Sequence, residues 1–326
     1  MSGLLSLYPQ LEPATSMKLD VAGGHALYVE TCGAAQGVPV LFLHGGPGSS
    51  INPNHRRFFD PAFYRIVLFD QRGCGKSAPV GGISHNTTQH LIDDIERLRI
   101  ELRVERWILF GGSWGSALAL AYAQCHPQRV RAMVLRGVFL ASRAEVAWFL
   151  EGLRAFMPEA WLRLSGGDDG ASAAALLARY HAEVFGGDAC AALTAAERWN
   201  AYEGAVMAVG EASAPQSAAP AVGVAPVGSL ARVRVQLHYL VHDCFLAPGA
   251  LLEGAAKLPP MPVIIVQGRR DLVCPPATAH ALHRRWPGSS LRMVEEGGHS
   301  AMHPAMVDAL VRAMQEVRRS IEGGSA

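Results

Sequence analysis

The segment Gly111-Gly-Ser-Trp-Gly115 constrains the fold of this chain more than any other feature. An apolar run at 107–110 precedes it, and an Ala- and Leu-rich run at 116–125 follows it. A serine on a sharp strand-to-helix turn has a strained backbone, and glycine neighbours avoid steric clashes there. A chance turn of small residues is the alternative, but the flanking segments favour the functional interpretation. The pattern therefore predicts that Ser113 lies exposed at the carboxyl end of a buried strand, beside a helix N-terminus.

Strand-like and helix-like segments alternate on both sides of this turn. A helical period places Leu91, Ile95 and Leu98 on one face, whereas the strand candidates are short apolar or β-branched runs. Strands separated by helices predict an α/β fold with a mainly parallel sheet covered on both faces. The predicted strands are 25–31, 38–43, 65–69, 107–110, 130–135, 263–267 and 290–294, and the predicted helices are 88–102, 116–125, 277–286 and 302–321.

The middle of the chain has a different pattern, because helix-like segments there are not separated by strands. We therefore expect a core of residues 1–140 and 246–326, with 141–245 inserted as a helical cap domain. Within the insertion, residues 211–228 are rich in Ala, Pro, Val and Gly, which predicts a mobile loop.

A serine nucleophile needs a base, and the base needs a carboxylate that orients it. On a sheet of this type the chain order is serine, then acid, then histidine. Asp271 follows the predicted strand 263–267, and His299 follows the last predicted strand. The alternatives are that Asp271 caps the next helix and that His299 is a solvated loop residue. His303 is the rival base, although it is expected at the start of the final helix.

The segment His44-Gly-Gly-Pro-Gly48 directly follows another predicted strand. A glycine-rich turn can direct backbone N–H groups at a developing oxyanion, together with the N–H of the residue after the nucleophile. This assigns Gly46 and Trp114 to an oxyanion hole. An ordinary Gly-Pro turn is the alternative.

Composition excludes several other functions. With 29 basic and 28 acidic residues, the chain has no excess of positive charge for nucleic acid. The six cysteines lack Cys-x-x-Cys spacing, and the thirteen histidines form no metal motif, so no metal or cofactor is expected. Gly75-Lys-Ser77 resembles the end of a phosphate-binding loop, but Asp70 stands where that motif needs glycine. No signal peptide or membrane span is evident, so a soluble cytoplasmic protein without membrane partners is the default expectation.

Several motifs together resemble the proline iminopeptidases, which are serine peptidases of the α/β-hydrolase fold. The resemblance runs from about residue 5 to residue 315 and weakens in the insertion. It rests on the segments His44-Gly-Gly-Pro-Gly48, Asp70-Gln-Arg-Gly-Cys-Gly-Lys-Ser77, Asn86-Thr-Thr88, Gly111-Gly-Ser-Trp-Gly-Ser116, Leu135-Arg-Gly-Val-Phe-Leu140 and Gly268-Arg-Arg-Asp271 with Cys274-Pro275.

This resemblance implies release of N-terminal proline from small peptides through an acyl-enzyme. Ser113 would be the nucleophile, His299 the acid–base and Asp271 the residue that orients it, while Phe139 would contact substrate. Glu203 matches a family glutamate that binds the substrate's imino group, in a Trp-Glu-Gly-Ala run that here begins with tyrosine. Gln236 stands where the family has a second glutamate. An esterase or amidase of the same fold is the competing interpretation, and the oligomeric state is not indicated.

Overall fold

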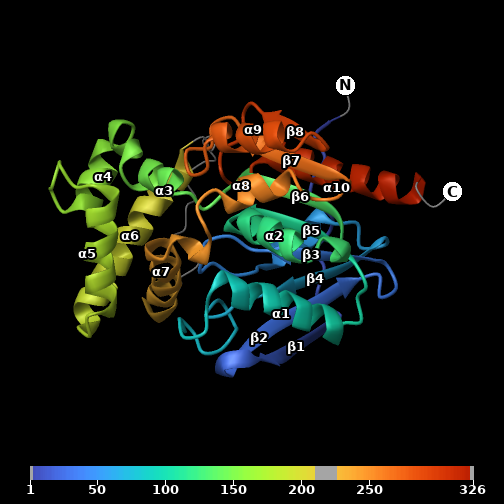
Figure 1. Ribbon diagram of the computed structural model, residues 1–326, viewed down its shortest axis with the longest axis horizontal. Helices are drawn as coiled ribbons and strands as arrows, with labels where there is room; N and C mark the ends of the chain where they lie inside the picture. The colour runs from blue at the N-terminus through green and yellow to red at the C-terminus, as the bar shows by residue number, and fades with distance from the viewer. Residues whose placement is uncertain (1–2, 210–225, 324–326) are drawn as a thin grey trace.

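The computed structural model describes residues 3–209 and 226–323 of the chain. These residues form one sheet of eight strands in the order β1-β2-β4-β3-β5-β6-β7-β8 (Figure 1). The strands β3 to β8 run parallel to one another, whereas β2 is antiparallel to both β1 and β4. The strands are β1 (Thr15–Val21), β2 (His25–Gly33), β3 (Val38–Leu43), β4 (Tyr64–Phe69), β5 (Trp107–Ser113), β6 (Val130–Val138), β7 (Val263–Gly268) and β8 (Ser289–Val294).

The predicted mainly parallel α/β sheet is confirmed, and every strand expected from the sequence is present. The strand β1 is not predicted by the sequence pattern. It lies at the edge of the sheet and only Leu19 is buried, so it carries no continuous apolar run. Its position comes from pairing with β2, in a register that sets Leu19 opposite Leu27.

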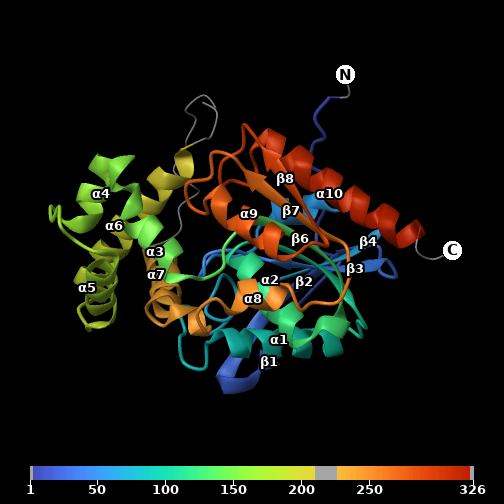
Figure 2. The same ribbon diagram turned by 45° about the horizontal axis from the view of Figure 1, so that its top comes forward.

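Helices cover the two faces of the sheet as the alternation of its side chains requires. On β3, Leu41 and Leu43 pack into one apolar cluster, whereas Val40 and Phe42 pack into another on the opposite face. The first cluster includes α1 (Thr88–Glu101), α2 (Trp114–Cys125), α8 (Ala250–Ala255) and α9 (Pro276–Arg285). The second is covered by α10 (Pro304–Gly323), drawn in red in Figure 2.

Residues 143–209 and 226–241, which lie between β6 and α8, are mostly helical and lie beside the sheet in both ribbon views (Figures 1 and 2). Residues 211–225 of the predicted mobile loop fall outside the described residues, but its last three residues begin α7, because the apolar face of that helix packs on α5 and α6. The helices of this segment are α3 (Arg143–Leu150), α4 (Pro158–Ser165), α5 (Ala173–Phe185), α6 (Ala189–Ala208) and α7 (Pro226–Val241).

Short 3₁₀ turns complete the described elements: η1 (Ala22–Gly24), η2 (Pro53–Phe58), η3 (Pro127–Arg129), η4 (Gly152–Ala155) and η5 (Asp243–Phe245). Within residues 3–209 and 226–323, no helix combines the length and the apolar character that crossing a bilayer would need.

The helix α7 is tied to the core by the predicted motif at Asn86. The Tyr239 hydroxyl donates to Asn86 Oδ1 at 2.9 Å, and His238 Nε2 lies 2.8 Å from the Asn86 carbonyl oxygen. The Tyr239 ring also meets the Trp114 ring edge to face. These contacts fix the rotation of α7, and with it the side chains that α7 directs toward Ser113.

Candidate active site

Ser113 ends β5 with φ 56° and ψ −127°, a conformation that L-residues rarely adopt. The glycines beside it are required by close packing. A Cβ atom at Gly111 would lie 2.2 Å from the carbonyl oxygen of Gly115, and one at Gly115 would lie 2.0 Å from that of Leu43. At the turn, the backbones of β5, α2 and β3 are therefore too close together for any residue larger than glycine at positions 111 and 115.

His299 and Asp271 come from separate loops at the carboxyl ends of β8 and β7. The two Asp271 carboxylate oxygens lie 2.9 and 2.8 Å from His299 Nδ1. Asp271 is 1% exposed, and its carboxylate also accepts from the Cys274 N–H at 2.8 Å and from Gln267 Nε2 at 3.3 Å. The carboxylate thus faces His299 and does not cap α9. The rival His303 instead accepts from the Ala305 N–H at the start of α10.

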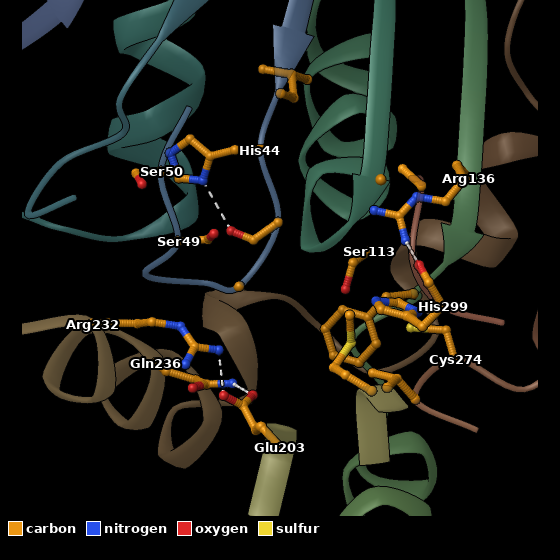
Figure 3. Close-up of a pocket in the computed structure, with 18 of the residues that line it drawn as sticks. His44, Ser49, Ser50, Ser113, Arg136, Glu203, Arg232, Gln236, Cys274 and His299 are labelled. Carbon is orange, nitrogen blue, oxygen red and sulfur yellow. Dashed lines mark hydrogen bonds and ion pairs between the residues drawn. The ribbon is translucent and has the colours of Figure 1, made fainter. Parts of the chain in front are cut away.

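One cavity of about 260 Å³ joins the predicted site residues. Ser113 and His299 line it together with Gly46, Phe139, Glu203 and Gln236. In Figure 3 the Ser113 hydroxyl points into this space, with His299 on one side and Glu203 on the other. Trp114 does not line the cavity with its side chain, so its backbone N–H at the start of α2 is the group available for the predicted role.

The loop that carries Gly46 is held in place by the motif residues around it. His44 is buried, its Nε2 accepts from the Gln71 N–H at 3.0 Å, and Gln71 Nε2 donates to the His44 carbonyl oxygen. Gln71 Oε1 in turn accepts from Trp114 Nε1 at 2.9 Å. Burial lowers the pKa of His44, more strongly than the nearby Asp70 carboxylate raises it. The imidazole is therefore neutral, as its acceptor role requires.

The segment after β4, residues 70–77, resembles a phosphate-binding loop in sequence but has a structural role. The Asp70 carboxylate accepts from the N–H groups of Ile51 and Lys76, both at 2.8 Å. A Cβ at Gly75 would lie 2.2 Å from the same carboxylate. Asp70 therefore fills the centre of the loop and joins it to the loop after β3.

Cys274 lies beside the nucleophile, although the sequence analysis assigns it no role. Burial raises the pKa of its thiol well above the usual range, and a hydrogen bond with Ser113 acts in the opposite direction. The thiol is therefore neutral and contributes a polarisable wall to the cavity.

Arg136 is a second residue that the sequence analysis missed. It follows the apolar run of β6 and lines the cavity, and its Nη1 donates to the His299 carbonyl oxygen at 2.5 Å. Burial lowers its pKa, partly offset by the Asp271 carboxylate. A Cβ at Gly112 would lie 2.5 Å from the guanidinium, so the second glycine of the turn provides the space for Arg136.

Glu203 on α6 and Gln236 on α7 lie within hydrogen-bond distance of each other, and Arg232 joins them. Gln236 Nε2 donates to Glu203 Oε1 at 2.6 Å, and Trp199 Nε1 donates to Gln236 Oε1 at 2.9 Å. Arg232 Nη2 donates to the other carboxylate oxygen, Glu203 Oε2 (Figure 3). The sequence offers one signal for Arg232, its position four residues before Gln236 on the same helix face.

Phe139 is positioned by the nucleophile turn itself. Ser116 Oγ donates to the Ser113 carbonyl oxygen at 2.7 Å and accepts from the Phe139 N–H at 3.0 Å. The Phe139 ring thereby lines the cavity between the end of β6 and the inserted helices.

No group of three or more His, Cys, Asp or Glu side chains among the described residues could hold a metal ion. Ser113, His299 and Asp271 are arranged so that they can perform nucleophilic attack by a serine, assisted by a carboxylate-bound imidazole.

Comparison with known proteins agrees with this geometry. The family model described as "alpha/beta hydrolase fold" matches residues 38–305. Among solved structures, an alpha/beta fold family hydrolase from Bacillus anthracis superposes with a TM-score of 0.62 at 16% identity, covering 95% of this chain and all of that one. An esterase from Exiguobacterium antarcticum gives a TM-score of 0.57 at 20% identity, covering 93% of this chain and all of that one. These two likenesses show the fold alone.

Sequence relatives are closer. A proline iminopeptidase from Xylella fastidiosa is 42% identical over 310 residues, which cover 94% of this chain and 98% of the relative. One from Arabidopsis thaliana is 41% identical over 319 residues, covering 96% of this chain and 82% of the relative. With the fold and the motifs matched along nearly its whole length, the chain is a hydrolase of the α/β-hydrolase fold and belongs to the proline iminopeptidase family.

Proposed function

We propose that this enzyme releases N-terminal proline from small peptides through an ester formed on Ser113. One observation carries the proposal: Ser113 and His299 line the same cavity, and His299 is held by the buried Asp271 carboxylate. The relatives, which are named proline iminopeptidases, support the choice of a prolyl substrate.

His299 acts as the base because Asp271 selects its tautomer. An ionised carboxylate only accepts hydrogen bonds, so the proton of the neutral imidazole resides on Nδ1, which faces Asp271. Nε2 is left to accept the proton of the Ser113 hydroxyl as the oxygen attacks the prolyl carbonyl carbon. Only the neutral imidazole can accept this proton.

The N–H groups of Gly46 and Trp114 stabilise the oxyanion of the tetrahedral intermediate. Gly46 has φ 114°, a value suited to glycine, and the Trp114 N–H lies at the positive end of α2. When the intermediate collapses, His299 returns the proton to the leaving amine and the C–N bond breaks. Water then attacks the prolyl ester by the same route, which frees proline and restores Ser113.

Residues 141–245 act as a cap domain over the part of the cavity that receives the prolyl group, which is the acyl side of the cavity. Phe139 offers apolar surface to the pyrrolidine ring, and Glu203 accepts a hydrogen bond from the imino group beside Gln236. The Glu203 side chain is 13% exposed, so water competes little with the substrate N–H for this carboxylate.

A panel of 2-naphthylamides carrying proline, alanine or leucine tests this proposal, with 2-naphthyl acetate as a neutral ester. We expect the prolyl amide to have the highest kcat/KM among the amides. Ser113→Ala is expected to lower turnover by several orders of magnitude on every substrate while leaving the fold unchanged. Rapid ester hydrolysis with no cleavage of any aminoacyl amide would instead identify an esterase.

A further inference from the structure

The acyl side of the cavity holds a carboxylate that is already paired. Both Glu203 oxygens accept hydrogen bonds from within the protein, Oε1 from Gln236 and Oε2 from Arg232. The Glu203 side chain is 13% exposed and that of Arg232 is 33% exposed, so the ion pair is only partly open to solvent. A substrate that enters this cavity therefore meets a neutral pair and not a free negative charge.

Two features of the helices hold Arg232 in this position. Arg232 and Gln236 are one turn apart on α7, so both reach the same face of α6. Arg232 Nη1 also donates to Asn200 Oδ1, one turn before Glu203 on α6, and Asn200 is itself bound to Ser229 Oγ at 2.5 Å. The guanidinium thus bridges two acceptors on α6, which makes its displacement by an incoming amine costly.

The backbone beneath Arg232 is fixed as well. A Cβ atom at Gly48 would lie 2.4 Å from the Arg232 carbonyl oxygen, so α7 lies directly against the loop that carries Gly46. Outward movement of α7 would separate it from this loop. Rotation of the Arg232 side chain would free one oxygen of the Glu203 carboxylate, and Gln236 would still be bonded to the other.

We propose that Arg232 is a specificity-determining residue that widens the substrate range to prolyl-type acyl groups with a neutral nitrogen. The class comprises N-acylated proline and the five-membered lactam of pyroglutamate. This inference rests on the proposed function, because it concerns the acyl group that the same serine transfers.

The chemistry of this class matches the paired site. A carbonyl oxygen next to the ring nitrogen accepts a hydrogen bond from Arg232, which has five N–H donors and no acceptor. A lactam N–H also donates to a remaining lone pair of Glu203. A protonated imino group offers Glu203 a positive charge, but it lies close to the like charge of Arg232 and has no oxygen for the guanidinium. Arg232 therefore favours the neutral groups and weakens binding of the cation.

The test compares kcat/KM for proline 2-naphthylamide with kcat/KM for its N-acetyl and pyroglutamyl counterparts, in wild type and Arg232→Met. In wild type, we expect the free and the neutral substrates to be cleaved within about tenfold of each other. In Arg232→Met, the ratio of free to N-acetyl substrate is expected to rise about tenfold or more, the equivalent of one charge-assisted hydrogen bond gained by the cation. The change is expected mainly in KM, because Ser113 and His299 are not altered.

Arg234→Met is the matched control. Arg234 lies on the same helix and its removal changes the net charge equally, but its side chain stacks on Phe185 and bonds the Val184 carbonyl oxygen outside the cavity. The control is expected to keep the wild-type ratio. If Arg232→Met does not fold, Arg232→Gln removes the same charge and can still donate to Asn200.

The inference is overturned if the ratio of kcat/KM for free to N-acetyl substrate is the same in wild type and both Arg232 variants. It is also overturned if wild type cleaves the free substrate more than about a thousandfold faster than the N-acetyl substrate. Failure of the proposed function gives a different result, in which wild type cleaves none of the naphthylamides. In that case, the ratio of kcat/KM for the free substrate to kcat/KM for the N-acetyl substrate is measured with the p-nitrophenyl esters of proline and N-acetylproline. A rise in Arg232→Met would still support the role of Arg232, and no change would overturn it.

Discussion

Replacing Asp271 by asparagine keeps the shape of the side chain but removes the charge that faces His299. In the native enzyme, Asp271 Oδ1 accepts from the Cys274 N–H at 2.8 Å, while Oδ1 and Oδ2 lie 2.9 and 2.8 Å from His299 Nδ1. The amide oxygen of asparagine must stay with Cys274, because that N–H only donates. The amide nitrogen then faces His299, donates to Nδ1 and moves the imidazole proton to Nε2, where it blocks acceptance of the Ser113 proton.

The expected loss follows from these contacts. A hydrogen bond to a charged group contributes about 1.5–3 kcal/mol. An inverted histidine tautomer in a serine–histidine–aspartate triad lowers kcat by about four orders of magnitude. We therefore expect Asp271→Asn to lower kcat by a factor of about 10³–10⁴, equivalent to about 4–5.5 kcal/mol of barrier. The free energy of unfolding should change by only about 1 kcal/mol, because the bond to Cys274 is kept.

The assay is steady-state hydrolysis of proline 2-naphthylamide, with urea unfolding of the same samples. Glu295→Gln is the matched control, since it makes the same chemical change four residues before His299. Glu295 is exposed and its carboxylate lies 3.0 Å from Arg269, so turnover should stay near the wild-type value. Retention of more than a tenth of wild-type turnover by Asp271→Asn, or an equal loss in Glu295→Gln, would refute the assigned role.

Three further outcomes are expected. Ser113→Gly should be more stable to urea than Ser113→Ala by about 1 kcal/mol, because glycine adopts φ 56° without strain; equal stability would contradict this. A serine-directed phosphonate should inactivate the enzyme and appear on Ser113 by peptide mass spectrometry, whereas EDTA should have no effect; activity lost in EDTA and restored by zinc would contradict this. Burial lowers the pKa of His55 from its ordinary value of 6.5 to about 3. The free energy of unfolding that depends on neutral His55 is therefore fully present above pH 6.5 and decreases as the pH falls toward 3. Between pH 7 and 4.5, wild type should lose about 2–3 kcal/mol more than His55→Gln in urea titrations, and equal losses would show that His55 is not responsible.

Much of the core could be predicted from the sequence because its elements follow local patterns. Strand β5 and helix α2 join at Ser113, where the glycines at 111 and 115 indicate a tight turn, and the apolar runs of β3 and β7 indicate strands buried on both faces. The edge strand β1 has no such run, since water covers much of its surface, and its pairing with β2 is a long-range contact. Helix α7 begins within residues whose composition suggests a loop, because packing on α5 and α6 outweighs local propensity.

The type of chemistry can be inferred from the residues alone, because the chemical identity and order of Ser113, Asp271 and His299 do not depend on distant contacts. The charge of the cavity, in contrast, depends on long-range packing. Arg136 has no local pattern that separates it from a solvated surface arginine, and the one signal for Arg232 is its spacing from Gln236. The fold places Arg136 beside His299 and Arg232 on Glu203. Residues 203 and 232 lie on different helices, so the ion pair exists only because α6 and α7 pack together at one rotation. The role proposed for Ser113 thus follows from a local turn, whereas the acyl groups proposed for the cavity depend on how two helices pack.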